Sequence, residues 1–192
     1  QVDGKGVYSF CMCPGGIIAP CATSNGEVVT NGWSPSKRNN PYSNSGIVVS
    51  IDPTDFDNPA DPFVCLRFQQ EVERICYEST GENQKVPAQR LKDFVDGKLS
   101  SDFPRSSYTP GIVSVRLDEL LPQLVSKRLQ KAFVAFDKKM PGFLTNDAVV
   151  HAPESRTSSP ILIPRNRETF QHVEIENLYP CAEGAGYAGG IV

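Results

Sequence analysis

At 192 residues, 39% of them hydrophobic, the chain is long enough to bury one substantial core, alone or with a small lobe, and we expect one compact unit. Its formal net charge of −3, from 19 basic and 22 acidic residues without long runs of either sign, argues against a nucleic-acid partner. The apolar runs are far shorter than the roughly 20 residues of a membrane helix, so no membrane partner is expected. Six cysteines are too few for a disulfide scaffold in a chain of this length, so a cytoplasmic protein is expected.

The first 51 residues predict a small, loop-rich sheet. Three β-prone runs, at 7–13, 27–30 and 47–51, are separated by clusters of Gly, Pro, Asn and Ser. The segment 32–46 is long for a connection and poor in aliphatic residues. We expect a functional or mobile loop there.

The middle of the chain changes to a helical period. Apolar residues at helical spacing predict a helix over 62–79. A second helix is expected over 87–97, with Pro87 in its first turn. The broadest apolar stripe predicts the longest helix, over 117–140, with Pro122 near its first turn.

The last third returns to strand-like patterns at 147–152, 159–164 and 176–183, and then continues as a glycine-rich turn. Together the elements predict an α+β fold. We expect a mixed or mostly antiparallel β-sheet, with barrel-like closure as an alternative, and two to three packed helices.

The stretch "YSFCMCPGG" places two thiols one residue apart, before Pro14, Gly15 and Gly16. A metal site is disfavoured, because structural zinc sites need four ligands and a different spacing. Cys11 and Cys13 remain candidates for a redox or proton-transfer role, or for two small apolar side chains in a core. The glycines allow a third interpretation, a turn that a flat or anionic ligand approaches closely.

The stretch "LYPCAEGAGYAGGIV" at 178–192 combines a strand-like entry, the acidic Glu183 and a run of small residues. This pattern suits a carboxylate that accepts hydrogen bonds from sugar or ribityl hydroxyls, followed by backbone amides that face electron-rich oxygens. A plain helix contact made of small residues is the alternative. Its glycine-rich end also suggests a piece of a longer protein.

A third polar stretch, "ESRTSSPILI", places Glu154 and Arg156 on one face of an extended chain, before three hydroxyl residues. It fits either a salt-bridged edge or the polar wall of a cleft.

Taken in order, "YSFCMCPGG", "VTNGWS" with "RNN", "RTSSP" and "LYPCAEGAGYAGGI" resemble the C-terminal part of the uncharacterised FAD-dependent dehydrogenase family. The resemblance implies a parent oxidoreductase that transfers a hydride through FAD, and a fragment that lacks the N-terminal Rossmann region. Residues 1–177 would be an inserted substrate-side domain and 178–192 a returning segment of the FAD-binding domain. The isolated chain would be inactive and without FAD.

The resemblance also implies partners: the missing FAD-binding domain, a small-molecule substrate, and NAD(P)H as a candidate electron donor. A non-catalytic protein-binding module and a thiol-redox protein using Cys11 and Cys13 are the alternatives. The sequence departs from the similar proteins at Ala182, where glycine is usual, and at Leu162, where arginine is frequent.

Carried over by residue, the resemblance places Glu183 at the ribityl or pyrophosphate end of FAD. Glu154, Arg156, Arg38 and Asn39 are our candidates for polar contacts with substrate or flavin, and Glu154 and Arg156 are also candidate catalytic residues. The residues expected beside the isoalloxazine are Gly184, Ala185, Gly186, Tyr187, Ala188, Gly189 and Gly190. The residues expected on the opposite wall are Cys11, Met12, Cys13, Pro14, Gly15 and Gly16.

Overall fold

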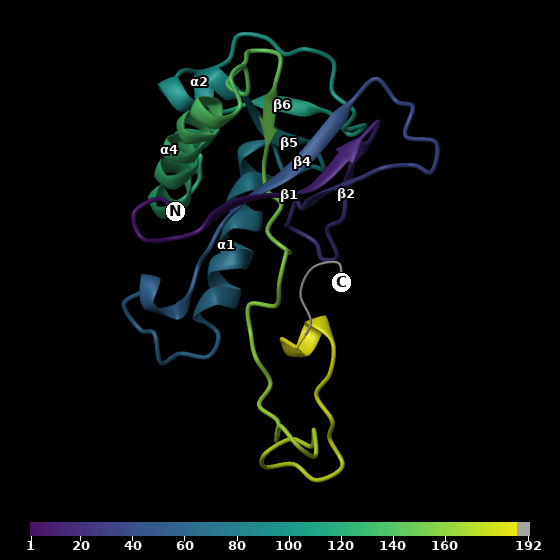
Figure 1. Ribbon diagram of the computed structural model, residues 1–192, viewed down its shortest axis with the longest axis vertical. Helices are drawn as coiled ribbons and strands as arrows, with labels where there is room; N and C mark the ends of the chain where they lie inside the picture. Colours follow the sequence, from purple (N-terminus) through teal and green to yellow (C-terminus); the bar gives the residue numbers. More distant parts are fainter. Residues whose placement is uncertain (188–192) are drawn as a thin grey trace. The chain divides into compact units, whose positions relative to one another are not determined.

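The computed structural model describes residues 1–187 (Figure 1). These residues confirm an α+β fold of small antiparallel and mixed sheets, and among them no sheet closes into a barrel. The chain divides into two compact units. The first unit comprises 1–50 and 71–155, and the second comprises 51–70 and the chain from 156 onward. The expectation of one compact unit is therefore wrong, because the chain forms a larger and a smaller unit.

Two antiparallel strand pairs form in the N-terminal part of the first unit. Strand β1 (Val7–Pro14) pairs with β4 (Ser43–Val49), and the two run side by side in Figure 1. Strand β2 (Ile17–Pro20) pairs with β3 (Thr30–Trp33). In the run expected at 27–30, Thr30 alone is part of a strand, as the first residue of β3. Val28 and Val29, just before it, are buried.

The third sheet of the first unit is mixed. Its central strand β5 (Val86–Arg90) runs parallel to β6 (Ile112–Ser114) and antiparallel to β7 (Val149–His151). The predicted helix over 87–97 is therefore wrong in its first half, and only α2 (Leu91–Asp96) is helical. The reason is tertiary: the first four residues of β5 are buried between partner strands, so strand pairing overrides the local helical pattern.

The other helices follow the hydrophobic period. Helix α1 (Val64–Ser79) confirms the expectation for 62–79. The expected helix over 117–140 is interrupted, as α3 (Leu117–Leu120) ends before α4 (Gln123–Lys139) begins. Pro122 occupies the N-cap of α4, where its missing N–H costs no helical hydrogen bond.

In the core of the first unit, α2 and α3 pack against β5, and α4 packs against both of these helices. The Phe94 and Phe133 rings meet edge to face, with their centroids 5.7 Å apart. Leu117 is fully buried beside them. An edge-to-face aromatic pair in such a position adds about 1 kcal/mol to the burial energy of the two rings.

The second unit contains little regular structure. It has the short 3-10 helix η1 (Pro53–Asp55), the first turns of α1, and a long irregular segment that ends in the 3-10 turn η2 (Glu183–Ala185). The strands predicted at 159–164 and 176–183 are absent from this described segment. Their backbone groups bond instead to turns, as in the 3.2 Å hydrogen bond from the Ile163 N–H to the Ala185 carbonyl.

A cation stacked between aromatic rings holds the irregular segment of the second unit together. The Arg165 guanidinium carbon lies 3.7 Å from the centroid of the Tyr187 ring and 4.9 Å from that of Phe170. The same guanidinium donates a 2.6 Å hydrogen bond to the Pro180 carbonyl. In this irregular segment, cation–π contacts of one arginine thus take the role that packing of apolar side chains has in the first unit.

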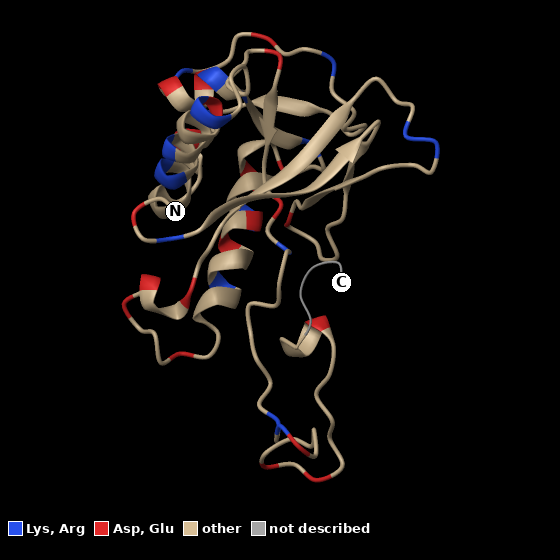
Figure 2. Cartoon of the chain, in the orientation of Figure 1, with Lys and Arg blue, Asp and Glu red and all other residues tan. Residues whose placement is uncertain are grey.

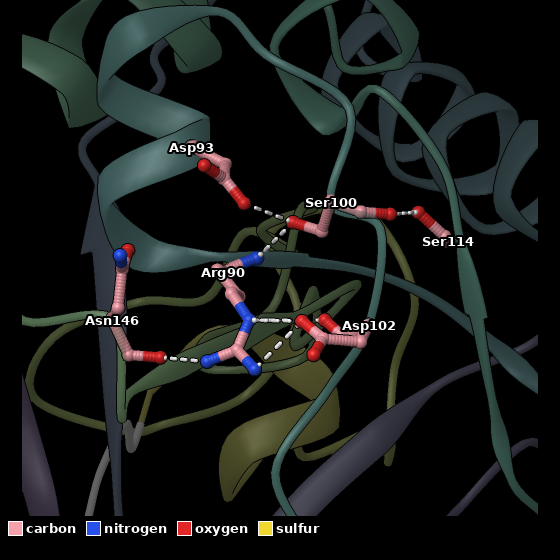
Figure 3. A network of polar contacts seen from close by, with 6 residues as sticks. All are labelled: Arg90, Asp93, Ser100, Asp102, Ser114 and Asn146. Atoms are coloured by element: carbon pink, nitrogen blue, oxygen red, sulfur yellow. Dashed lines mark hydrogen bonds and ion pairs between the residues drawn. The ribbon is translucent and has the colours of Figure 1, made fainter.

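A polar network fixes the loop after α2 (Figure 3). The buried Ser100 hydroxyl accepts a 2.8 Å hydrogen bond from the Arg90 backbone N–H and donates one of 2.7 Å to the Asp93 carboxylate. The Arg90 guanidinium in turn binds Asp102, at 2.9 Å, and the Asn146 carbonyl. The loop is tied to β5 by these bonds rather than by apolar contacts.

Substitution Ser100→Ala should lower the free energy of unfolding by about 2 kcal/mol, because it leaves a buried backbone N–H without its acceptor. Urea denaturation of the chain measures this loss, with Ser101→Ala as the control, since Ser101 is exposed. Equal unfolding midpoints for the two variants would contradict the role given to the Ser100 hydroxyl.

Lysine and arginine residues are frequent along α4 (Figure 2). Its last turn carries Lys138 and Lys139, which the negative end of the helix dipole favours.

Among the described residues, no helix combines the length and the apolar character that crossing a membrane requires.

Candidate functional site

A cavity of about 280 Å³ lies within the second unit. It is formed by the N-terminal turns of α1, by the segment after residue 155, and by the η2 turn. We call it the Arg156–Glu183 cavity. Its lining residues are Leu66, Gln69, Arg156, Ser158, Ser159, Pro160, Ile161, Glu183 and Gly184.

The cavity brings together residues that the sequence singled out from two separate motifs. Arg156 comes from "ESRTSSPILI", whereas Glu183 and Gly184 come from the glycine-rich end of the chain. Arg156 is thus one of the residues that line this cavity. A guanidinium, a carboxylate and hydroxyl groups belong to these residues, although the exposed lining of the cavity is mostly apolar.

Sequence reasoning missed the helix wall of the cavity. Leu66 and Gln69 lie three residues apart on α1 and therefore share one face of the helix. An apolar residue and an amide at this spacing are equally common on a helix that only packs against its neighbours. The sequence therefore holds no signal that separates a cavity wall from ordinary helix packing.

Hydrogen bonds hold the two segments of the cavity against each other. The Ile163 N–H donates a 3.2 Å hydrogen bond to the Ala185 carbonyl. The Tyr187 hydroxyl donates one of 2.8 Å to the Ile163 carbonyl. Tyr187, one of the residues expected to face a flavin, is thus also a structural link within this unit.

The glycines of this region differ in what surrounds them. No heavy atom lies within 4 Å of the position that a Cβ on Gly184 would take, so the space beside this residue is open. A Cβ on Gly186 would lie 2.7 Å from the Ile161 carbonyl oxygen, and its φ is +82°. Gly186 is therefore required by the chain's own packing, whereas Gly184 is not.

Two neighbours of these glycines are also placed by the structure. Ala185 is buried. Ala182 has a φ of +61°, a value that favours glycine. Ala188, Gly189 and Gly190, predicted beside a flavin, lie outside the described residues.

The second group of predicted residues lies in the first unit, on β1. The register between β1 and β4 shifts between Phe10 and Cys13, so Cys11 and Met12 form a bulge, and Cys11 has a φ of +50°. Cys13 is buried, whereas the Met12 side chain is 75% exposed. The Sγ atoms of Cys11 and Cys13 lie 4.0 Å apart. We call this pair the Cys11–Cys13 bulge.

The glycine turn after the bulge is filled by the chain itself. Gly15 has a φ of +60°, and a Cβ there would overlap the Arg38 carbonyl group and lie 2.8 Å from the Asn39 nitrogen. A Cβ on Gly16 would lie 2.7 Å from the Trp33 carbonyl oxygen. Both glycines therefore admit the backbone that follows β3, which accounts for them without a ligand.

Glu154 lies at the end of the first unit, close to the same strands. Its Oε2 atom is 2.7 Å from the position of a Cβ on Gly46, in β4. Burial raises the pKa of the Glu154 carboxyl. The pKa of the Cys11 thiol is also raised, by burial first, then by the hydrogen bond and charge of Cys13 and by the charge of Glu154.

A family model described as "FAD-dependent protein, C-terminal domain-like" matches residues 1–157. The chain is also similar to an uncharacterized protein of Clostridium beijerinckii, with 38% identity over 190 residues. This alignment covers 98% of the chain but 35% of the relative. The chain therefore spans about a third of the length of the curated relative that it matches.

Proposed function

This chain belongs to the C-terminal domains of FAD-dependent proteins, and from this premise we propose that it is the C-terminal part of a flavin-dependent oxidoreductase. In that enzyme FAD, when bound, takes a hydride from a small-molecule substrate or passes one on. The observation that carries the proposal is the meeting of Arg156, Glu183 and Gly184 in one cavity of the second unit.

The cavity residues fit a flavin or a substrate bound beside it. The Arg156 guanidinium and the Ser158 hydroxyl can donate hydrogen bonds to carbonyl or phosphate oxygens. The Glu183 carboxylate can accept hydrogen bonds from hydroxyls such as those of a ribityl chain. The open space at Gly184 lets a flat group approach the backbone, and the apolar side chain of Leu66 excludes water from one wall.

The rest of the active site belongs, in this proposal, to an N-terminal FAD-binding domain of the same protein. Residues 1–177 are then an inserted substrate-side domain and 178–192 the returning segment, with NAD(P)H as a candidate electron donor. The greater length of the relative supports this organisation. So do exposed apolar side chains in the irregular segment of the second unit, which suit a docking surface for that domain: Leu162, Phe170, Val173, Ile175 and Tyr179.

The proposal is tested by an absorbance spectrum and a flavin extraction on the full-length protein, beside the 192-residue chain, each purified from cells. We expect a yellow full-length protein that releases FAD and a colourless chain, because the chain alone lacks the domain that binds the adenine end. A colourless full-length protein that also fails to bind added FAD would overturn the proposal and favour a non-catalytic binding module.

A further inference from the structure

The two thiols of the Cys11–Cys13 bulge face each other, and the flavin proposal uses neither of them. Their Sγ atoms are 4.0 Å apart, and the Cys13 thiol donates a 3.2 Å hydrogen bond to the carbonyl oxygen of Cys11. Formation of a disulfide bond would bring these atoms from 4.0 Å to roughly 2.05 Å.

The backbone of the bulge is what brings the thiols together. A regular strand would place Cys11 and Cys13 on one face with the spacing of alternate residues, but the register shift and the φ of +50° at Cys11 re-aim its side chain. A non-glycine residue in this conformation is uncommon and costs free energy. Such conformations concentrate at functional sites, where the surrounding structure maintains them.

The two thiols also differ in access. Cys11 is half-buried, while Cys13 is buried beneath it. A reagent from solution therefore meets Cys11 first. This order, an accessible thiol backed by a buried one, is that of an attacking and a resolving cysteine.

We propose that Cys11 and Cys13 form a reversible intramolecular disulfide by exchange with a small disulfide of the glutathione class. The Cys11 thiolate attacks one sulfur of the small disulfide, which forms a mixed disulfide and releases the first small thiolate. The Cys13 thiolate then attacks the Cys11 sulfur and releases the second. The two protons lost by the cysteines are taken up by the two released thiolates, so the dithiol is oxidised and the small disulfide is reduced by two electrons.

The surroundings raise the pKa of the Cys11 thiol, by burial first, then by Cys13 and by the charge of Glu154. A raised pKa lowers the thiolate fraction and slows the first attack, but a dithiol whose thiolate is disfavoured forms a disulfide more readily at equilibrium. The inference goes beyond the proposed flavin chemistry and does not depend on it, because the exchange needs no bound cofactor.

The test uses the 192-residue chain in buffers of reduced and oxidised glutathione at graded ratios, followed by alkylation and mass spectrometry. We expect the peptide with Cys11 and Cys13 to lose the mass of two hydrogens in a single two-electron transition. Cys13→Ser should instead accumulate glutathione on Cys11. Cys65→Ser, which removes a thiol elsewhere in the chain, should leave the transition unchanged. A wild-type chain that keeps both thiols alkylatable at every ratio, or that carries glutathione stably on Cys11, would overturn the proposal.

Glu154→Gln supplies a second readout that does not require oxidation. Removal of the negative charge should speed alkylation of Cys11 by iodoacetamide at pH 7.5 roughly twofold to fivefold, because more thiolate is present. The groups that set the charge state of Cys11 are Cys13 and Glu154. Glu176→Gln, at an exposed carboxylate of the second unit, is the control and should not change the rate. Equal rates for Glu154→Gln and the wild type would overturn the role assigned to Glu154.

Discussion

Substitution Gly15→Ala should lower the free energy of unfolding of this chain by about 3 kcal/mol or more. Two costs add at this residue. An alanine at a φ of +60° costs roughly 1–2 kcal/mol on its own. The new Cβ would also overlap the Arg38 carbonyl group and approach the Asn39 nitrogen, and backbone atoms of a packed loop cannot move aside as a flexible side chain can.

The chain offers a matched control for the conformational part of this cost. Gly26 also has a positive φ, of +79°, but no heavy atom lies within 4 Å of the position of its Cβ. Gly26→Ala should therefore show the conformational cost alone, about 1 kcal/mol. Urea denaturation of both variants separates the two effects, and equal losses would mean that the Arg38–Asn39 backbone does not pack on Gly15 as described.

This result also limits how the glycine turn can be used to test function. Because Gly15 and Gly16 are needed by the chain's own backbone, a variant at either residue would lose flavin whenever the first unit loses its fold. Loss of flavin in such a variant would not identify a contact with the cofactor. The prediction that this turn lines the active site has to be tested by another route, such as chemistry at the neighbouring thiols.

Parts of the fold could be predicted from sequence where a local pattern and its environment agree. Helix α1 follows its hydrophobic period, which buries Val72 and Cys76. Strand β1 follows its β-prone run and pairs with β4. The helix expected over 87–97 failed at β5 because neighbouring strands, remote in sequence, pair with this segment. The strands expected at 159–164 and 176–183 failed for the opposite reason, since no neighbouring strand pairs with them.

The candidate site divides in the same way. Arg156 and Glu183 could be found from sequence because charged residues beside hydroxyls or glycines are recognisable as motifs. Leu66 and Gln69 could not, since their spacing also suits ordinary helix packing. For glycines the sequence does not tell whether the missing side chain makes room for the chain or for a ligand. Only the surrounding atoms distinguish Gly15, which is covered by backbone, from Gly184, which faces open space.

That distinction yields the sharpest test of the cavity. In the full-length protein, Gly184→Val should leave the melting temperature of the flavin-free form nearly unchanged, because no heavy atom lies within 4 Å of the new Cβ and the residue has no positive φ. Gly184 lines the Arg156–Glu183 cavity, so the added side chain should compete there with a flat ligand that approaches the backbone.

We expect Gly184→Val to weaken FAD binding on the order of 10-fold to 100-fold, equivalent to about 1.4–2.7 kcal/mol. Gly184→Ala should show a smaller loss, because the effect should grow with side-chain volume if the ligand and the side chain compete for one space. Fluorescence titration of the flavin-free protein with FAD measures both affinities. If both variants bind FAD as the wild type does while Arg156→Ala weakens binding, the ligand contacts the guanidinium wall but not the Gly184 backbone, and the returning segment does not lie against the flavin as proposed.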